Sequence, residues 1–387
     1  MSGRAFVNLP TDRVIYGAGT LVDLAPELDR LGLRRAFVIT GETIATKTTL
    51  LERAKYVLGP RFAGAYTRAG QHVPRTRVLE AARAAAAART DVLVSLGGGS
   101  PIDSAKAAAF AIAEKLEQPD DFNRYSTRWP PPGGARVPFT ASTPPAHIAI
   151  PTTLSAGEHT PNAGQTDETR RRKDGISHPL LAPKVVILDP EVTRDTPPPL
   201  WASTGMRAFD HAVERFCSPH HQPITDPLCL EAIRRLVRRL PASTRDAEDM
   251  DARLACLIAA WLSIHGAFNA PTGLSHAIGH QLGGRCGVPH GITSCITLAR
   301  VMAFNAPAVP ERMAAIAEAM GTGSAPAGVA DLVQALGLPS RLSETGKVSE
   351  DDLEPIARQT FEELRPGLNP RPVESATQIL AILKDAW

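Results

Sequence analysis

The stretch Asp91-Val-Leu-Val-Ser-Leu-Gly-Gly-Gly-Ser-Pro-Ile-Asp-Ser-Ala-Lys106 joins an apolar run to a helical pattern through three glycines. The apolar run predicts a buried strand over residues 91–96. Ser100 and Pro101 predict the start of a helix that continues to about Glu114, with Ser100 as its N-cap. A strand, a tight turn and a helix in this order are the building unit of open α/β sheets.

Similar units lie on both sides of this stretch. Apolar runs predict further strands over residues 35–40, 147–150 and 185–188, and an alanine-rich helix over 78–89. Strands that alternate with helices predict a parallel, doubly wound sheet. After Pro190 only helical patterns remain. We therefore predict an α/β, Rossmann-like N-terminal domain over 1–190 and an all-α C-terminal domain over 191–387.

Two polar segments interrupt the N-terminal pattern. Residues 165–175 read as a turn, and the proline-rich residues 118–145 as a long ordered loop. In that loop Tyr125 and Trp129 either line a pocket or only pack.

The glycine turn predicts a phosphate site. Glycine amides can approach an anion closely, and the N-terminus of the following helix adds partial positive charge. Thr152 and Thr153 end the next strand, and ligands bind at the carboxyl ends of such strands. Asp103 and Lys106 then face the ligand, with Lys106 near phosphate or ribose; the alternative is a capping carboxylate and a surface lysine. The predicted cofactor contacts are Gly41, Gly97, Gly98, Gly99, Ser100, Asp103, Lys106, Thr152, Thr153 and Leu154.

The first predicted strand bears on the choice of cofactor. In nicotinamide-binding folds, an acidic residue at its end binds the ribose 2′-hydroxyl and repels a 2′-phosphate. Here Gly41 stands at that position and Glu42 follows it. We therefore expect NADPH to be accepted, alongside NADH.

Four histidines in the C-terminal half form a second candidate site. His276 and His280 lie four residues apart, on one face of a helix, and His290 follows a glycine-rich bend that lets it fold back toward them. His211 lies in an earlier segment, with Arg207 one helical turn before it. Converging imidazoles bind a metal, relay protons or hold an anionic substrate.

Taken together, these motifs resemble the iron-containing alcohol dehydrogenase family. The resemblance rests on Tyr16-Gly-Ala-Gly19, the glycine turn, Leu188-Asp-Pro-Glu191, the Gly205–Glu214 segment and the histidine segment ending at Gly291. Within the family the chain is most similar to the maleylacetate reductases, in segments 71–74, 152–161, 280–284 and 303–307. The long 118–145 loop and Gly291 follow the alcohol dehydrogenases instead. The resemblance implies the fold shared with dehydroquinate synthases, and a homodimer.

Arg207 changes the chemistry that the resemblance implies. Metal-dependent members have an aspartate at this position, with histidines corresponding to His211, His276 and His290. An arginine cannot ligate a cation, because it has no free lone pair and stays protonated. We hypothesise that Arg207 replaces the metal–carboxylate unit and polarises a carbonyl or clamps a substrate carboxylate. The alternative is that it turns outward to a surface acid such as Asp210. Asp210 itself is a doubtful substitute ligand, because adjacent helix residues point about 100° apart.

The function predicted from these residues is reduction of a small carbonyl compound or an unsaturated keto acid by NADPH or NADH, without a catalytic Fe or Zn. Arg207, His211, His276 and His290 hold the substrate, and His280 or His276 supplies the proton. For His280 the alternative is a core histidine. The rival functions are a metal-dependent alcohol or aldehyde dehydrogenase, a dehydroquinate synthase-like lyase that uses NAD transiently, and a nucleotide-binding protein without activity.

Composition limits the other partners. The formal net charge of +2 gives no field that favours nucleic acid, and no apolar stretch has the length of a membrane span. Five widely spaced cysteines without a CxxC pair predict reduced thiols, and no signal peptide is recognisable. We expect a cytoplasmic enzyme that binds a small substrate with a carboxylate.

Overall fold

The computed structural model describes residues 5–127, 142–170 and 172–387. The chain divides into two compact units: Leu9–Thr196, and Pro197–Trp387 together with the described residues before Leu9. The boundary between the units therefore lies after Thr196, whereas the sequence predicted it after residue 190. Val7 belongs to the second unit through a 2.7 Å hydrogen bond from its backbone N–H to Asn269.

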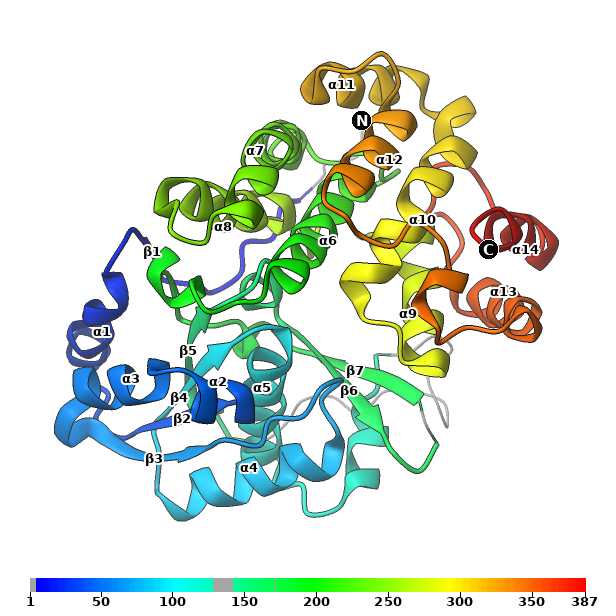
Figure 1. Ribbon diagram of the computed structural model, residues 1–387. Coiled ribbons are helices and arrows are strands. Elements are labelled where there is room, and N and C mark those ends of the chain that lie inside the picture. The colour runs from blue at the N-terminus through cyan, green and yellow to red at the C-terminus, as the bar shows by residue number, and fades with distance from the viewer. Residues whose placement is uncertain (1–4, 128–141, 171) are drawn as a thin grey trace. The chain divides into compact units, whose positions relative to one another are not determined.

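The N-terminal unit is built on a parallel sheet of six strands (Figure 1), which confirms the predicted fold class. All of its pairings are parallel, and the spatial order is β1-β8-β5-β4-β2-β3. The predicted strands are all present. Two were not predicted, β1 and β3. The strands are β1 (Arg13–Tyr16), β2 (Ala36–Thr40), β3 (Phe62–Tyr66), β4 (Val92–Gly97), β5 (Ala146–Pro151) and β8 (Val185–Leu188).

Helices cover both faces of this sheet, because side chains alternate between the faces along each strand. On one face, Phe37 and Ile39 of β2 pack in a core with residues of α4 (Arg75–Ala87) and α5 (Gly99–Glu114). On the other face, Val38 of β2 packs in a core with α1 (Leu24–Leu31) and α3 (Leu50–Leu58). The short α2 (Glu42–Lys47) follows β2 directly.

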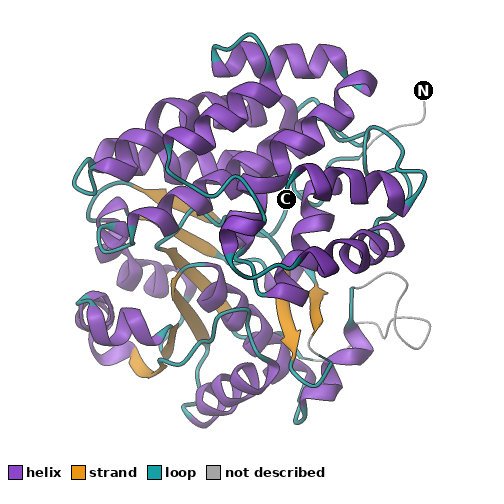
Figure 2. Ribbon diagram, turned by 45° about the vertical axis from the view of Figure 1, so that its right-hand side comes forward, coloured by secondary structure: helices purple, strands orange, loops and turns teal. Residues whose placement is uncertain are grey.

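The predicted turn over 165–175 is confirmed only for residues 168–170, and most of the segment is extended. This region contributes to a two-stranded antiparallel ribbon, β6 (Asn162–Asp167) and β7 (Arg172–Ser177), drawn in orange apart from the main sheet in Figure 2. A polar strand has little apolar alternation to reveal it. Arg75 stabilises the ribbon: its guanidinium is fully buried and contacts Asp167 at 2.9 Å and Asp174 at 3.1 Å.

Two further details differ from the sequence prediction. Helix α5 begins at Gly99, with Gly98 as N-cap and no side-chain cap, so the assignment of Ser100 as N-cap was wrong. Tyr125 packs: its ring meets Phe110 edge to face at 4.9 Å, and its hydroxyl donates to Glu114 at 2.6 Å. Trp129 lies outside the described residues.

The described residues of the C-terminal unit form helices joined by loops and contain no strand, as predicted. Its helices are α6 (Pro198–Phe216), α7 (Thr225–Arg245), α8 (Met250–Ile264), α9 (Leu274–Cys286), α10 (His290–Asn305), α11 (Pro310–Met320), α12 (Ala325–Ala335), α13 (Leu353–Glu363) and α14 (Ala376–Asp385). One core joins α9, α10, α13 and α14 around Leu274, Ile278 and Ile296. In the described part of the chain, no helix combines the length and apolarity needed to cross a bilayer.

Candidate functional site

The glycine turn has the geometry that close approach of an anion requires. Gly97 has a φ of +144°, which side-chain-bearing residues rarely adopt. A Cβ on Gly98 would lie 3.0 Å from the side chain of Thr153, and one on Gly99 would lie 3.2 Å from Ser155 Oγ. Because no side chain caps α5, the amides of its first turn are available to a ligand. The turn therefore fits the phosphate group of a nucleotide.

The neighbouring threonines follow β5 at the same edge. Thr152 donates its backbone N–H to Gly97 O at 3.0 Å, which ties the two turns together. Thr153 and Leu154 are buried beside it. The structure thus places these residues with the glycine turn, as the sequence predicted.

Asp103 and Lys106 have a different role from the predicted one. The Lys106 ammonium is fully buried and donates to Gly157 O at 2.5 Å and Asn162 O at 2.8 Å. Asp103 accepts from Gly164 N–H at 3.1 Å. Neither a contact of Lys106 with phosphate nor the alternative of a surface lysine fits this geometry. The two side chains brace the segment that leads into β6.

Gly41 lies where the sequence placed it, between β2 and α2. It is the N-cap of α2, with a φ of −88° that any residue adopts, and a Cβ there would be 3.7 Å from Ala69 O. An aspartate would therefore fit at this position, so the fold does not require a glycine here.

In the C-terminal unit, helix α6 carries Arg207, Asp210, His211 and Glu214 on successive turns. All four side chains are buried. Arg207 Nη1 lies 3.5 Å from Asp210 Oδ2 and 3.2 Å from Ser294 Oγ of α10. The alternative in which Arg207 turns outward was wrong, although its partner is the acid that was named. Burial lowers the pKa of Arg207, and Asp210 opposes that change.

Asp210 is the centre of a buried hydrogen-bond cluster. Its Oδ2 accepts from Ser294 Oγ at 2.6 Å and from Ser275 Oγ at 3.0 Å. Both serines lie on other helices, α10 and α9, so the carboxylate links three helices. Burial raises the pKa of Asp210, whereas the Arg207 guanidinium and both serine hydroxyls favour its charged form.

His211 and His276 lie side by side, with ring centroids 4.9 Å apart. Glu214 Oε2 lies 2.6 Å from His276 Nδ1. Burial, reinforced by the charge of Arg207, lowers the pKa of both histidines well below the usual value, so both are neutral. Among the described residues, His211 Nδ1 and His276 Nε2 are buried without a hydrogen-bond partner.

His280 and His290 form the second pair of rings, with centroids 5.7 Å apart. His290 is the first residue of α10 and does fold back, as the sequence predicted. His280 is exposed, so the alternative of a core histidine was wrong. An exposed imidazole can exchange protons with water, which the neutral, buried His276 cannot easily do.

Several contacts bear on whether a metal ion fits these residues. Asp210, Glu214 and His276 offer ligand atoms within 4.8 Å of one another. Glu214 and His276 Nδ1 already bind each other, and Asp210 Oδ2 accepts from two serines, whereas Asp210 Oδ1 and His276 Nε2 have no hydrogen-bond partner among the described residues. A divalent ion there would also lie close to the Arg207 guanidinium, which repels it. At the position of Arg207 itself, the side chain offers no lone pair.

Sequence reasoning gave no role to three members of this cluster, Glu214, Ser275 and Ser294, and it named Asp210 only as a surface partner of Arg207 or a doubtful ligand. Asp210 and Glu214 lie three and seven residues after Arg207, which places them on the same helix face, and that spacing is readable. The serines give no such signal, because only the packing of α9 and α10 against α6 brings them near.

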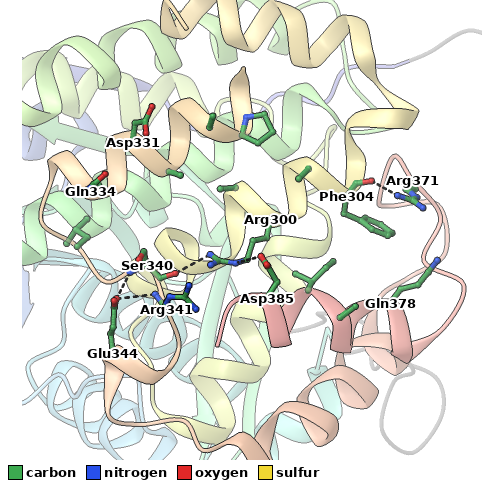
Figure 3. Close-up of a pocket in the computed structure, with 18 of the residues that line it drawn as sticks. Arg300, Phe304, Asp331, Gln334, Ser340, Arg341, Glu344, Arg371, Gln378 and Asp385 are labelled. Carbon is green, nitrogen blue, oxygen red and sulfur yellow. Dashed lines mark hydrogen bonds and ion pairs between the residues drawn. The ribbon is translucent and has the colours of Figure 1, made fainter. Parts of the chain in front are cut away.

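A large cavity of the C-terminal unit is lined by other residues. It measures about 1070 Å³ and is lined by residues of α10, α12 and α14, with Arg300 paired to Asp385 at 2.8 Å (Figure 3). Neither Arg207 nor any of the four histidines lines it. The charged residues that line this cavity are three arginines and three acidic residues: Arg300, Arg341, Arg371, Asp331, Glu344 and Asp385. Their charges balance, so charge alone favours no class of ligand.

Known proteins match the chain along most of its length. The pattern of iron-containing alcohol dehydrogenases matches residues 10–190, and that of the C-terminal region of the Fe-containing alcohol dehydrogenase family matches residues 201–387. Maleylacetate reductase of Rhizobium sp. (strain MTP-10005) is 32% identical over 378 residues, which cover 97% of this chain and 95% of the relative.

Two further relatives are an alcohol dehydrogenase and a second maleylacetate reductase. The NAD-dependent methanol dehydrogenase of Bacillus methanolicus is 31% identical over 388 residues, covering 96% of this chain and 97% of the relative. The crystal structure of maleylacetate reductase from Agrobacterium tumefaciens superposes with a TM-score of 0.83 at 31% identity, covering 100% of this chain and 99% of the other. The chain therefore belongs to the iron-containing alcohol dehydrogenase family and is an NAD(P)-dependent oxidoreductase.

Proposed function

We propose that this oxidoreductase reduces a small carbonyl compound or an unsaturated keto acid, as a maleylacetate reductase does, and needs no catalytic metal. The observation that carries the proposal is the buried Arg207, held by Asp210 and Ser294 where metal-dependent relatives have a ligand. A carboxylate with a divalent ion carries a net charge of +1, and one guanidinium carries the same charge.

The guanidinium is oriented for binding an anion. Nη1 is engaged with Asp210 and Ser294. In the described part of the chain, Nε and Nη2 have no hydrogen-bond partner and are not fully enclosed. These two groups form the fork that binds a carboxylate in bidentate fashion. Such a fork favours a substrate with a carboxylate over a simple alcohol.

The cofactor is held by the other unit. Gly97 to Ser100 and the start of α5 bind the pyrophosphate, and Gly41 leaves room for a 2′-phosphate. When bound, the nicotinamide supplies the hydride. His280, which is exposed to water, supplies the proton.

One observation favours a second candidate, a metal-dependent alcohol or aldehyde dehydrogenase. His211 Nδ1 and His276 Nε2 are buried nitrogens without partners, and neutral imidazole nitrogens are common metal ligands. The match to a methanol dehydrogenase is consistent with it. The third candidate, a lyase that uses NAD transiently, differs from both because it would cause no net change in the amount of NADH.

The test is an assay of NADPH and NADH oxidation by the purified protein after exhaustive chelation. Maleylacetate serves as the keto acid, and acetaldehyde as the carbonyl compound without a carboxylate. We expect turnover of the keto acid to survive chelation and to exceed that of acetaldehyde. Turnover of acetaldehyde alone, lost on chelation, would support the metal-dependent candidate instead.

A further inference from the structure

The helix that carries His276 begins without a cap from its own segment. Gly273 is the N-cap of α9 and provides no side chain, so the first amides of the helix need partners from elsewhere. Glu214, from α6, accepts from Gly273 N–H at 3.0 Å, Ser275 N–H at 2.6 Å and His276 N–H at 3.3 Å. A carboxylate at a helix N-terminus also interacts favourably with the helix dipole.

The remaining amide of this turn is bound by Asn369, from the segment after α13. Asn369 Oδ1 accepts from Leu274 N–H at 3.3 Å. Asn305 holds the Asn369 amide in this orientation, since each amide donates to the other at 3.2 and 2.7 Å. A Cβ on Gly273 would lie 2.9 Å from Asn369 Oδ1, so a glycine is needed at the point where both side chains meet the helix.

Glu214 makes one more contact, with the His276 ring itself. Its Oε2 lies 2.6 Å from Nδ1, and the same oxygen accepts two backbone N–H groups. Both Glu214 oxygens accept backbone N–H groups, which favour its ionised form, whereas burial and Asp210 raise the pKa of Glu214 to about 8. The ionised carboxylate acts only as an acceptor. Against it, the ring proton lies on Nδ1, and Nε2 of the neutral ring has a lone pair.

We propose that Glu214 and Asn369 are positioning residues that fix His276 as the Nδ1–H tautomer, so that Nε2 can only accept a hydrogen bond from the bound ligand. The identity of that ligand rests on the proposed function, whereas the tautomer does not depend on it. It assigns different tasks to the two histidines named as proton sources. His276 orients the ligand as an acceptor, and the proton comes from His280.

The tautomer is measured directly by 15N NMR of the full-length protein labelled at histidine, with NADPH bound. The His276 signals are assigned by their loss in His276→Gln. We expect a proton on Nδ1 and an unprotonated Nε2. A proton on Nε2 would overturn the inference, whichever substrate the enzyme uses. A correct tautomer without turnover of keto acids would instead overturn only the proposed function.

Substitutions connect the tautomer to turnover. Glu214→Gln must place an amide N–H₂ against either a backbone N–H or the His276 ring, so we expect kcat to fall by about 10- to 100-fold with a smaller change in KM. Glu363→Gln is the matched control, because Glu363 binds Gln281 of the same helix α9 at 2.7 Å but lies away from its first turn. Asn369→Asp keeps the acceptor for Leu274 N–H and should retain more activity than Asn369→Leu. Equal kcat in Glu214→Gln and Glu363→Gln would contradict a positioning role.

Discussion

The guanidinium of Arg207 lies 3.5 Å from the carboxylate of Asp210, three residues further along α6, and both side chains are buried. Neither charge is stable alone in such surroundings, because the cost of removing an ion from water is only recovered through a close partner and further hydrogen bonds. Ser275 and Ser294 provide those hydrogen bonds to Asp210. The pair therefore fixes a positive charge in one orientation, beside His211 and His276.

Removing the guanidinium should reduce catalysis. Arg207→Gln loses the charge but keeps a polar side chain that can bind Ser294, and we expect kcat/KM to fall by roughly 100- to 1,000-fold, the loss typical of one group that stabilises developing charge. Steady-state kinetics with NADPH measures it. Arg285→Gln is the control, because Arg285 pairs on the surface with Asp352. Similar kinetics in the two variants would show that Arg207 does not touch the reaction.

The glycine turn gives a prediction about cofactor affinity. In Gly98→Ala the added methyl group would lie 3.0 Å from the Thr153 side chain, so the turn must shift and its amides change position. We expect the Kd of NADPH, measured by fluorescence titration, to rise by at least about tenfold. Gly323→Ala is the matched control, since a Cβ there has no atom within 4 Å. An unchanged Kd in Gly98→Ala would place the pyrophosphate elsewhere.

Gly41 should determine the choice between the two cofactors. Gly41→Asp places a carboxylate at the end of β2, where it repels a 2′-phosphate and binds a 2′-hydroxyl. We expect the ratio of kcat/KM for NADPH over NADH to fall by at least about tenfold. Gly41→Asn separates charge from size, because it has the same shape without the charge. If both variants keep the ratio of the wild type, the 2′ position does not lie at this turn.

A buried carboxyl in the N-terminal unit predicts a pH dependence of stability. Burial raises the pKa of Glu158 to about 7, and neither oxygen accepts a hydrogen bond from another described residue. The folded state therefore holds a proton that the unfolded chain releases near its ordinary pKa of 4.5. This group's contribution to stability is present below pH 4.5 and is lost as the pH rises toward 7.

Glu158→Gln should remove that loss, because an amide stays neutral. Relative to the wild type, we expect the variant to gain up to about 3 kcal/mol in the free energy of unfolding at pH 8 and much less at pH 5. Urea denaturation at the two pH values measures the difference. The exposed Glu362→Gln should show no such dependence. A gain of the same size at both pH values would mean that Glu158 titrates normally.

The sheet and the helical half were predictable because their signals are local. Four of the six strands are short apolar runs, and the glycine turn predicts both the end of β4 and the start of α5. The ribbon of β6 and β7 was not, since its strands are polar and are held by Arg75, which lies about 90 residues earlier in the chain. Such a contact leaves no trace in the hydrophobic pattern of either strand.

The candidate site shows the same limit. The histidines and Arg207 were found because their types and spacing are distinctive, whereas the role of Lys106 was misjudged. Its ammonium binds carbonyls of residues 157 and 162, more than fifty residues away, and nothing in the helix pattern shows on which side of α5 they lie. Glu214 was visible in sequence, but its partners on α9 depend on how the helices pack.

The central claim is that Arg207 takes the place of a metal, and elemental analysis of the purified protein combined with assays before and after chelation tests it most directly. The variant Arg207→Asp, which restores the ligand type of the metal-dependent relatives, serves as the comparison. We predict far less than one equivalent of Fe or Zn in the wild type, with activity unaffected by chelation, and higher metal content in the variant. About one equivalent of metal in the wild type, with activity that disappears on its removal, would contradict the claim.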